Sequence, residues 1–407
     1  MLLIYLTFWK GEGIDLQDVV IVAAARTAIG DFGGMFKDMI SHQLLVPIIQ
    51  EVIRRAGIEP AQIDDCIVGN CAQRSDEPNL GRTAALLAGL PKEVTGMTIQ
   101  RQCSSGMQAI VSGCQQIQTG DSEIVLAGGA ESMSTVPYVL KDARWGKRLQ
   151  HGQMTDALWE LLCDPIHKIM MGETAERLAE KYNISREEQD IIAYRSHKNA
   201  IRAIDEGLFK DEIVPINKKG RKGETITLDT DEHPRRDISL ENLAKLKPVF
   251  RPDGTVTAGN ASGLNDGAAA VILMSEKKAA SLGIKPLARI VSHARAGVEP
   301  DLMGYGPVPA IRKALARAGL NLNDIELIEL NEAFAAQYLA CEKLLDLNRE
   351  ITNVNGSGIS LGHPVGCTGT RITVSLVYEM HRRGCRYGLA SLCVGGGMGM
   401  AMILERI

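Results

Sequence analysis

Two features that mark particular classes of protein are missing from this sequence. It has no large excess of charge of either sign, because its net charge is −4 at pH 7. A chain this close to neutral does not attract polyanions over long range, so a general binder of nucleic acid or of acidic membranes is not expected. No apolar run is long enough to cross a bilayer, and membrane insertion is therefore not expected either.

Cysteine pairs with the spacing of metal or redox motifs are missing as well. The nine cysteines are an odd number, and no two of them have CxxC spacing. This argues against a disulfide framework and against a structural zinc site, so no metal site is predicted. Free thiols favour the reducing cytoplasm, where most of them are expected to be small apolar core residues.

What is present is the composition of a globular protein, with 45% hydrophobic and 23% charged residues. A chain of 407 residues is too long for one compact core, so two or three domains are expected. Residues 1–17 have neither the cationic start nor the small-residue cleavage site of a signal peptide. We expect them to be a disordered extension or the product of a start site assigned too early, which N-terminal mass spectrometry distinguishes.

Apolar strands alternate with amphipathic helices along much of the chain. Strands are predicted at residues 19–25, 67–68 and 124–127, the last ending at Gly128-Gly129, and helices at residues 42–56 and 103–119. Continuous apolar strands between helices are typical of an α/β protein with buried sheets.

Part of this pattern occurs twice. The stretch IRRAGIEPAQIDDCIVGN (53–70) is similar to LARAGLNLNDIELIELNE (315–332), and a loop, helix and strand follow each copy, at 103–129 and 363–397. We interpret this as a duplicated α/β unit with a pseudo-twofold axis, the alternative being a chance similarity. Such an axis would bring Cys103 and His363, which occupy corresponding positions, towards each other.

The residues between the copies differ in character. Residues 134–259 are rich in charge, with helices predicted near 174–182 and 186–205. This composition indicates an inserted, more solvated subdomain, which is a candidate lid or ligand clamp.

Cys103 is the thiol with the most informative surroundings. It lies in RQCSSGMQAI, at the start of a predicted helix. The positive end of the helix macrodipole lowers the pKa of a thiol placed there, so we expect an activated thiolate. The alternative is a buried structural cysteine.

Three further segments carry groups suited to catalysis. In NGSGISLGHPVGCTGTR, His363 lies on a stiff loop between a glycine and a proline, which suits a base for a thiol. In SLCVGGGMGMA, Cys393 ends a buried strand, and the glycines from Gly395 onward offer successive N–H groups to an anion. In ELNEAF, Asn331 follows a strand, where open α/β sheets bind ligands, although it would equally serve as a cap for the next helix.

Together these segments resemble one family, the thiolases, which include acetyl-CoA acetyltransferases and 3-ketoacyl-CoA thiolases. The resemblance runs from about Val19 to the C-terminus and also rests on VIVAAARTAIGDFGG, GGAESMS, DEIVPI, GTVTAGNASGLNDGAAA and MGYGPVPA, in the family's order. It implies an α/β fold whose duplicated halves form a layered α-β-α-β-α core with an inserted loop domain. The implied boundaries are 1–17 for the extension, 18–134 with 260–286 for the N-terminal half, 135–259 for the loop domain and 287–407 for the C-terminal half.

The resemblance also implies an activity and a role for each group. Thiolases cleave a 3-ketoacyl-CoA with CoA, or run the reverse Claisen condensation, in fatty-acid metabolism that includes β-oxidation. By resemblance, Cys103 is the acylated nucleophile, His363 is its base, and Cys393 is the acid or base at the α-carbon. Asn331 resembles a residue that holds a water, which with His363 forms one oxyanion hole. The backbone N–H groups of Cys103 and Gly395 form the other.

The substrates implied are coenzyme A thioesters, and no further cofactor is required. Arg235 resembles a residue near the nucleotide end of CoA, and residues 218–222 either face its phosphates or form a solvated charge run. The segment PYVLKDARWGKRLQHG resembles the loop through which relatives assemble homotetramers as dimers of dimers. The residues that resemble contacts to the pantetheine arm are Phe250, Ala258, Ser262, Met303, Ala333 and Phe334.

Two alternatives are weighed against this activity. A decarboxylating ketoacyl synthase of the same superfamily uses a cysteine with two histidines, or with a histidine and an asparagine, and Cys393 argues against it. An inactive thiolase-like carrier of acyl-CoA or lipid is expected to lack one of the three central groups, whereas Cys103, His363 and Cys393 are all present. The departures from the family pattern, such as Ser104 in place of a glycine, remove no catalytic group.

Overall fold

The computed structural model describes residues 17–220 and 222–407, so all but the last residue of the predicted extension lies outside the described residues. The first part of the chain contains β1 (Val19–Arg26), β2 (Gly30–Asp31), α1 (Ser41–Ala56), β3 (Asp65–Gly69), α2 (Leu80–Leu87), β4 (Thr95–Ile99), α3 (Ser105–Thr119) and β5 (Ile124–Ser132). The middle contains β6 (Tyr138–Val139), β7 (Thr155–Asp156), α4 (Ala157–Leu161), α5 (Met171–Lys181), α6 (Arg186–Asp205), β8 (Ile216–Lys219), β9 (Thr225–Leu228) and α7 (Leu240–Ala244). The last part contains β10 (Asn265–Ser275), α8 (Glu276–Ser281), β11 (Ala288–Gly297), α9 (Pro307–Ala318), β12 (Leu327–Leu330), α10 (Ala335–Leu345), α11 (Gly358–Leu361), α12 (Val365–Arg383), β13 (Tyr387–Val394) and β14 (Met398–Arg406).

The order of the strands confirms the predicted duplication. In one half of the sheet the order is β1-β10-β5-β3, with β4 at the outer edge, and in the other it is β11-β14-β13-β12. The second series repeats the first strand for strand. The halves meet where β1 pairs antiparallel with β11, Val20 opposite Arg289 and Ile21 opposite Ala288, so one continuous sheet runs through both copies.

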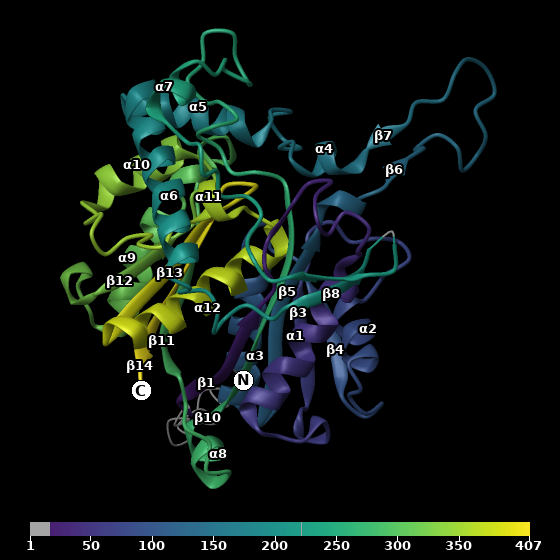
Figure 1. Ribbon diagram of the computed structural model, residues 1–407, viewed down its shortest axis with the longest axis vertical. Helices are drawn as coiled ribbons and strands as arrows, with labels where there is room; N and C mark the ends of the chain where they lie inside the picture. Colours follow the sequence, from purple (N-terminus) through teal and green to yellow (C-terminus); the bar gives the residue numbers. More distant parts are fainter. Residues whose placement is uncertain (1–16, 221) are drawn as a thin grey trace, which may run out of the picture.

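The predicted layers are also present. The helices α1 and α2 cover the outer face of the first half of the sheet, and α9 covers the outer face of the second half. The helices α3 and α12 lie side by side between the two halves, each packed against strands (Figure 1). Both strand faces are therefore covered, which explains why β1, β5 and β10 are buried along their whole length.

Glycines allow the two central helices to approach closely. A Cβ on Gly106 of α3 would lie 2.5 Å from Thr370 Oγ1, and a Cβ on Gly369 of α12 would lie 2.5 Å from Met107 N. Neither distance is compatible with a side chain, so the backbones touch where both helices begin. This contact brings the starts of the duplicated helices together, as the pseudo-twofold axis requires.

Two predicted boundaries are wrong. The strand expected to end at Gly128-Gly129 continues to Ser132, because both glycines pair with β10, opposite Ala270 and Ala269. Bare glycine is needed there, since a Cβ on Gly129 would collide with the Gly366 carbonyl. The helix expected from residue 103 begins at Ser105 instead.

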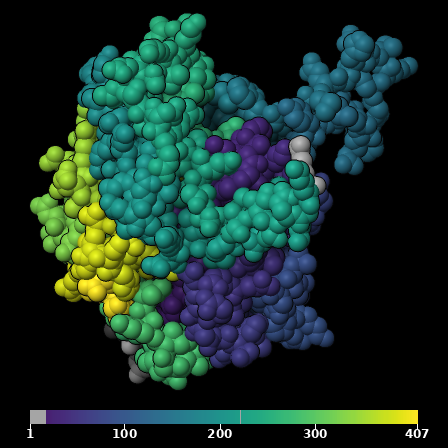
Figure 2. All heavy atoms as spheres, viewed as in Figure 1, coloured from purple at the N-terminus to yellow at the C-terminus, as the bar shows by residue number. Residues whose placement is uncertain are grey.

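The segment between β5 and β10 includes a projecting arm at residues 138–156, formed by β6, β7 and the residues between them. Figure 2 shows this arm standing clear of the body of the molecule. It carries large apolar side chains in solvent, with Trp145 93% exposed and Leu149 78% exposed. Helices α5 and α6 of the same segment pack instead against α10 and α11.

A fully buried ion cluster fastens this middle segment to the sheet. Arg26, the last residue of β1, donates from Nε to Glu212 at 2.7 Å and from its two terminal nitrogens to Asp231 at 2.7 and 3.0 Å. Asp231 also accepts from Ile29 N at 2.8 Å. Each charged group has a partner of opposite charge, so the cluster fastens residues 212 and 231 of the middle segment to the end of β1 without leaving an unpaired ion in the core.

Two findings concern what the described residues do not contain. Among residues 17–220 and 222–407, no helix combines the length and apolarity needed to span a bilayer. Within the same residues, no group of three or more His, Cys, Asp or Glu side chains is arranged to hold a metal ion.

The ion cluster generates a stability prediction. Asp231→Ala would leave Arg26 buried with only one partner, and breaking a buried pair costs about 3–5 kcal/mol. We expect the free energy of unfolding, measured in urea, to fall by about that amount. The control is Asp237→Ala, which removes the same charge from an exposed position and should change stability by less than about 0.5 kcal/mol. Equal effects of the two substitutions would contradict the assignment.

Candidate active site

Cys103 lies in a tight turn just ahead of α3. The preceding residue, Gln102, has a φ of 46°, a left-handed conformation that is uncommon outside glycine. The turn is closed by Ser105, whose hydroxyl accepts from Arg101 N at 2.9 Å and donates to Gln102 O at 2.6 Å. Cys103 is partly buried and faces a cavity. The turn therefore places Cys103 in the wall of that cavity.

His363 lies between α11 and α12, on a loop that only glycine allows. Gly362 has a φ of 98°, and a Cβ there would lie 2.6 Å from the side chain of Asn265, the first residue of β10. The side-chain Oδ1 of Asn265 accepts from His363 N at 2.9 Å. The first half of the sheet thus holds in place a histidine that belongs to the second half.

The imidazole of His363 is oriented by Thr368, on the first turn of α12. Its Nδ1 lies 2.7 Å from Thr368 Oγ1, which donates its own proton to Pro364 O at 3.0 Å. Nδ1 must therefore carry the ring proton, and Nε2 has a free lone pair with no hydrogen-bond partner among the described residues. Burial, together with the charge of Arg371, lowers the pKa of His363 to about 3, so the ring is neutral at pH 7. A neutral imidazole with a free Nε2 is in the form of a base.

The prediction that the helix start lowers the pKa of Cys103 is wrong. Burial raises the pKa of this thiol above its usual value of 9.0, and the charge of Glu131 adds to the rise. The N–H groups of Gly395 and of Cys103 itself bond to the sulfur and lower the pKa, but by less than burial raises it. The resting site therefore holds a neutral thiol and a neutral imidazole.

Cys393 lies near the end of β13, beside Cys103 and buried. Burial raises its pKa well above the usual value, and a charge on Cys103 would raise it further. The chain then turns sharply at Gly396 and Gly397, whose φ values of 76° and 79° favour glycine. This turn aims the Gly395 N–H at the sulfur of Cys103.

Asn331 follows β12 and is held by a backbone bond to Ser391 O on β13 at 2.9 Å. Its side-chain nitrogen lies 3.5 Å from His363 Nδ1, and its side-chain oxygen is buried with no hydrogen-bond partner among the described residues. The alternative role as a helix cap is wrong, because the residue ahead of α10 is Phe334.

The cavity in front of Cys103 has a volume of about 140 Å³. His363 lines it too, and of the residues predicted to contact CoA it is lined by Phe250, Ser262, Met303, Ala333 and Phe334. Arg235 and Ala258 are exposed and lie outside its lining. A second cavity of about 100 Å³ lies between Cys103, Gly395 and residues 161–166. Cys103 thus stands between two cavities.

Glu131 and Thr368 are site residues that no prediction included. Glu131, on β5, accepts from Cys71 N at 2.9 Å and from Gly366 N, in the first turn of α12, at 2.8 Å. Burial raises its pKa to about 7. The sequence offered one signal for each: Glu131 lies in the GGAESMS stretch, and Thr368 lies one helical turn beyond the His363 loop.

Comparison with known proteins adds independent findings. A family model described as "Thiolase, N-terminal domain" matches residues 19–277, and one described as "Thiolase, C-terminal domain" matches residues 284–406. An acetyl-CoA acetyltransferase of Syntrophomonas wolfei is 50% identical over 96% of this chain and 100% of its own length. The mitochondrial 3-ketoacyl-CoA thiolase of Homo sapiens is 47% identical over 96% and 98%.

Solved structures show the same similarity in three dimensions. The Bacillus anthracis acetyl-CoA acetyltransferase superposes with a TM-score of 0.95 at 60% identity, covering 96% of this chain and 99% of that one. The human mitochondrial 3-ketoacyl-CoA thiolase in complex with CoA superposes with a TM-score of 0.93 at 46% identity, covering 96% and 98%.

The raised pKa of Cys103 generates a prediction about pH. Iodoacetamide reacts with the thiolate, so the rate of alkylation of Cys103 should still be rising at pH 9, the usual pKa of a thiol. Mass spectrometry of the peptide that contains Cys103 measures this rate. The control is the urea-unfolded chain, in which the dependence of the rate on pH should be that of an ordinary exposed thiol. A plateau already reached near pH 7 would instead indicate a thiolate–imidazolium pair and contradict the prediction.

Proposed function

This chain belongs to the thiolase family and is an acyltransferase, and on that premise we propose that it cleaves 3-ketoacyl-CoA with CoA, and runs the reverse condensation, through an acyl group on Cys103. The observation that carries the proposal is the convergence of four groups from both halves of the fold. Cys103 and His363, with its free Nε2, line one cavity, the Gly395 N–H bonds to the sulfur of Cys103, and the buried Cys393 thiol lies close enough to Cys103 for their charges to interact.

In the first half of the reaction, His363 takes the proton of Cys103 as the sulfur attacks the 3-keto carbon. The bond between C2 and C3 then breaks, and the electron pair remains on C2 as the enolate of acetyl-CoA. Cys393 donates its proton to C2, which releases acetyl-CoA and leaves the acyl group on Cys103. Because both reacting partners start neutral, the proton moves with the attack and not before it.

Between the two halves, the His363 imidazolium returns its proton to the Cys393 thiolate. In the second half, the neutral His363 takes the proton of free CoA, whose sulfur attacks the acyl-Cys103 thioester, and then passes that proton to the departing Cys103 sulfur. The acyl group moves to CoA, and the Cys103 thiolate regains its proton. Run backwards, the same steps join two acetyl groups, with Cys393 removing the α-proton. A buried thiol with a raised pKa suits this role, because the α-carbon of a thioester is a weak acid and the thiolate must be a strong base.

Two oxyanion holes stabilise the charges that develop. The N–H groups of Cys103 and Gly395 point at the sulfur of Cys103, and the carbonyl oxygen of an acyl group bound to that sulfur would lie next to them. A water held by the free side-chain oxygen of Asn331 would act with His363 on the thioester oxygen of the enolate. Loss of one such donor typically slows a reaction by about 10²–10³-fold.

Coenzyme A would enter through the larger cavity. Ser262 and the apolar side chains of Phe250, Met303 and Phe334 suit the pantetheine arm, which is mostly apolar with a few amide groups. Arg235, exposed outside the cavity, suits the phosphates at the nucleotide end. The steps use only protein groups, the CoA thioesters and free CoA. We also propose the reducing cytoplasm as its compartment, because all nine cysteines are free thiols.

The arm at residues 138–156 supports a homotetramer built as a dimer of dimers. A monomer gains nothing from holding Tyr138, Trp145 and Leu149 in solvent, and aromatic side chains on a projecting element are typical of subunit contacts. Replacing residues 140–154 by a short glycine–serine turn should convert a tetramer to a dimer, as measured by light scattering. An unchanged mass would exclude the arm as the contact.

The two thiols can be separated by substitution. Cys103→Ala should lower turnover of acetoacetyl-CoA by about 10⁴-fold or more and abolish labelling of the enzyme by acetyl-CoA, because the nucleophile is gone. Cys393→Ala should lower turnover by about 10²–10⁴-fold, as expected for loss of an acid–base group, yet remain acetylated at Cys103.

Mass spectrometry of the acetylated peptide and a thiolysis assay measure the two effects. The control is Cys114→Ala, which removes a buried thiol on α3 away from the cavity and should leave both readouts unchanged. Near-normal turnover by the Cys103→Ala protein would overturn the mechanism, and failure of the Cys393→Ala protein to become acetylated would overturn the separation of roles.

A further inference from the structure

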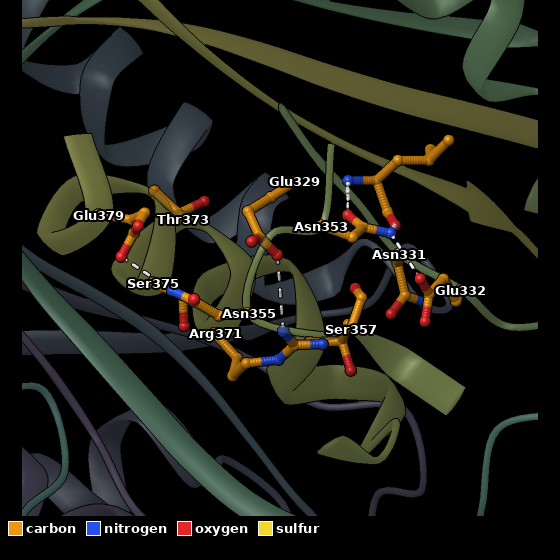
Figure 3. Close-up of polar contacts among 12 residues, drawn as sticks. Glu329, Asn331, Glu332, Asn353, Asn355, Ser357, Arg371, Thr373, Ser375 and Glu379 are labelled. Atoms are coloured by element: carbon orange, nitrogen blue, oxygen red, sulfur yellow. Dashed lines mark hydrogen bonds and ion pairs between the residues drawn. The ribbon is translucent and has the colours of Figure 1, made fainter. Parts of the chain in front are cut away.

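Arg371, in the second turn of α12, is a fully buried arginine whose charge is not paired by hydrogen bonds. Its Nε and both terminal nitrogens have no hydrogen-bond partner among the described residues. The nearest carboxylate, that of Glu329, is 3.9 Å away, too far for a hydrogen bond. Figure 3 shows the guanidinium between Glu329 and Ser357, whose hydroxyl is also unpartnered.

The contrast with Arg26 shows that this arrangement is unusual within the same molecule. Arg26 is equally buried, but its guanidinium makes hydrogen bonds of 2.7 to 3.0 Å to two carboxylates. A buried charge without such bonds lowers the stability of the fold. A cost of this kind, next to a reactive centre, indicates a role other than folding.

Arg371 is placed directly behind the proposed site. It lies on the helix that begins two residues after His363, and its charge acts on that imidazole. Glu329 and Asn331 are two residues apart at the end of β12, which places both side chains on the face towards α12. The guanidinium therefore lies behind His363 and Asn331, the two residues that would hold the enolate oxygen.

The neighbouring charges do not cancel that of Arg371. Arg26 and Asp231 are paired with each other, and burial raises the pKa of Cys367 to about 12, so that thiol is neutral. Burial raises the pKa of Glu329 to about 8 despite the attraction of Arg371, so this carboxyl is mostly protonated at pH 7. Cys103 is neutral at rest, and Glu131 accepts three backbone N–H groups. Burial raises the pKa of Glu332, whereas Glu212 and Glu379 are paired with arginines other than Arg371.

We propose that Arg371 is a positioning residue that acts through its charge on His363 and Asn331, where it stabilises the negative charge of the enolate oxygen. The inference rests on the proposed function. A fixed charge in a dry interior acts strongly because no water needs to reorient around the developing anion. The same charge adds to the effect of burial, which keeps His363 neutral in the resting enzyme and ready to accept a proton.

The test uses three variants of the full chain in the acetoacetyl-CoA thiolysis assay. Arg371→Met removes the charge at similar volume and should lower kcat by at least about tenfold, below the roughly 10²–10³-fold loss of a donor that touches the anion. KM should change little, and the acid limb of the pH profile should move to higher pH as His363 regains basicity.

Arg371→Lys keeps the charge and should recover most of kcat. Glu329→Gln should stay within about twofold of the parent, because that carboxyl is already mostly neutral.

Thermal unfolding separates this role from a structural one. Arg371→Met should be at least as stable as the parent, since it removes an unpaired buried charge. A parent-like kcat and pH profile in Arg371→Met would overturn the inference, as would equal losses of kcat and stability in the Met and Lys variants. If the Met variant does not fold, a loss of more than about tenfold in a stable Arg371→Lys protein overturns it. The proposed function fails separately, through turnover by the Cys103→Ala protein.

Discussion

The close packing of α3 against α12 is the constraint on which the rest of the molecule depends. Gly106 and Gly369 bring the two backbones into contact at the starts of the helices, where a methyl group on either residue would separate them. The turn before α3 carries the thiol, and the loop before α12 carries the imidazole. The site thus forms where two copies of one unit meet, and each copy supplies a different group to it.

Burial at this contact dominates the electrostatics. Because the central helices are covered by strands on both sides, the cost of removing charge from water outweighs the favourable field at a helix start, and the pKa of Cys103 rises. The same burial lowers the pKa of His363. The thiol of Cys103 and the imidazole of His363 therefore carry no charge at rest. A site of this kind is suited to a reaction in which charge appears only in transit and must meet groups already oriented towards it.

Much of the fold and of the candidate site could be predicted from the residues and their spacing, and the features that were missed have a common cause. The repeated stretches at 53–70 and 315–332 predicted the duplicated strand order. Glycines around Cys103, His363 and Cys393 marked segments that the structure brings together, with Cys103 and His363 on one cavity and Cys393 next to Cys103. Glu131 and Arg371 were missed because nothing local distinguishes a carboxylate in a strand or an arginine in a helix. The electrostatic properties of these two residues come from burial between layers, which depends on strands far away in sequence. The direction of the pKa shift of Cys103 was predicted wrongly for the same reason.

The way β1 is paired has a consequence for the newly made chain. Its partners β10 and β11 both lie beyond the long middle segment, and no neighbour in sequence covers either edge of this strand, which is apolar from Val19 to Ala25. As the chain leaves the ribosome, the backbone hydrogen-bonding groups of this strand stay unpaired by β10 and β11 until most of the protein has been translated. Such a segment is prone to pair with copies of itself, so the yield of folded protein depends on how well chaperones shield it.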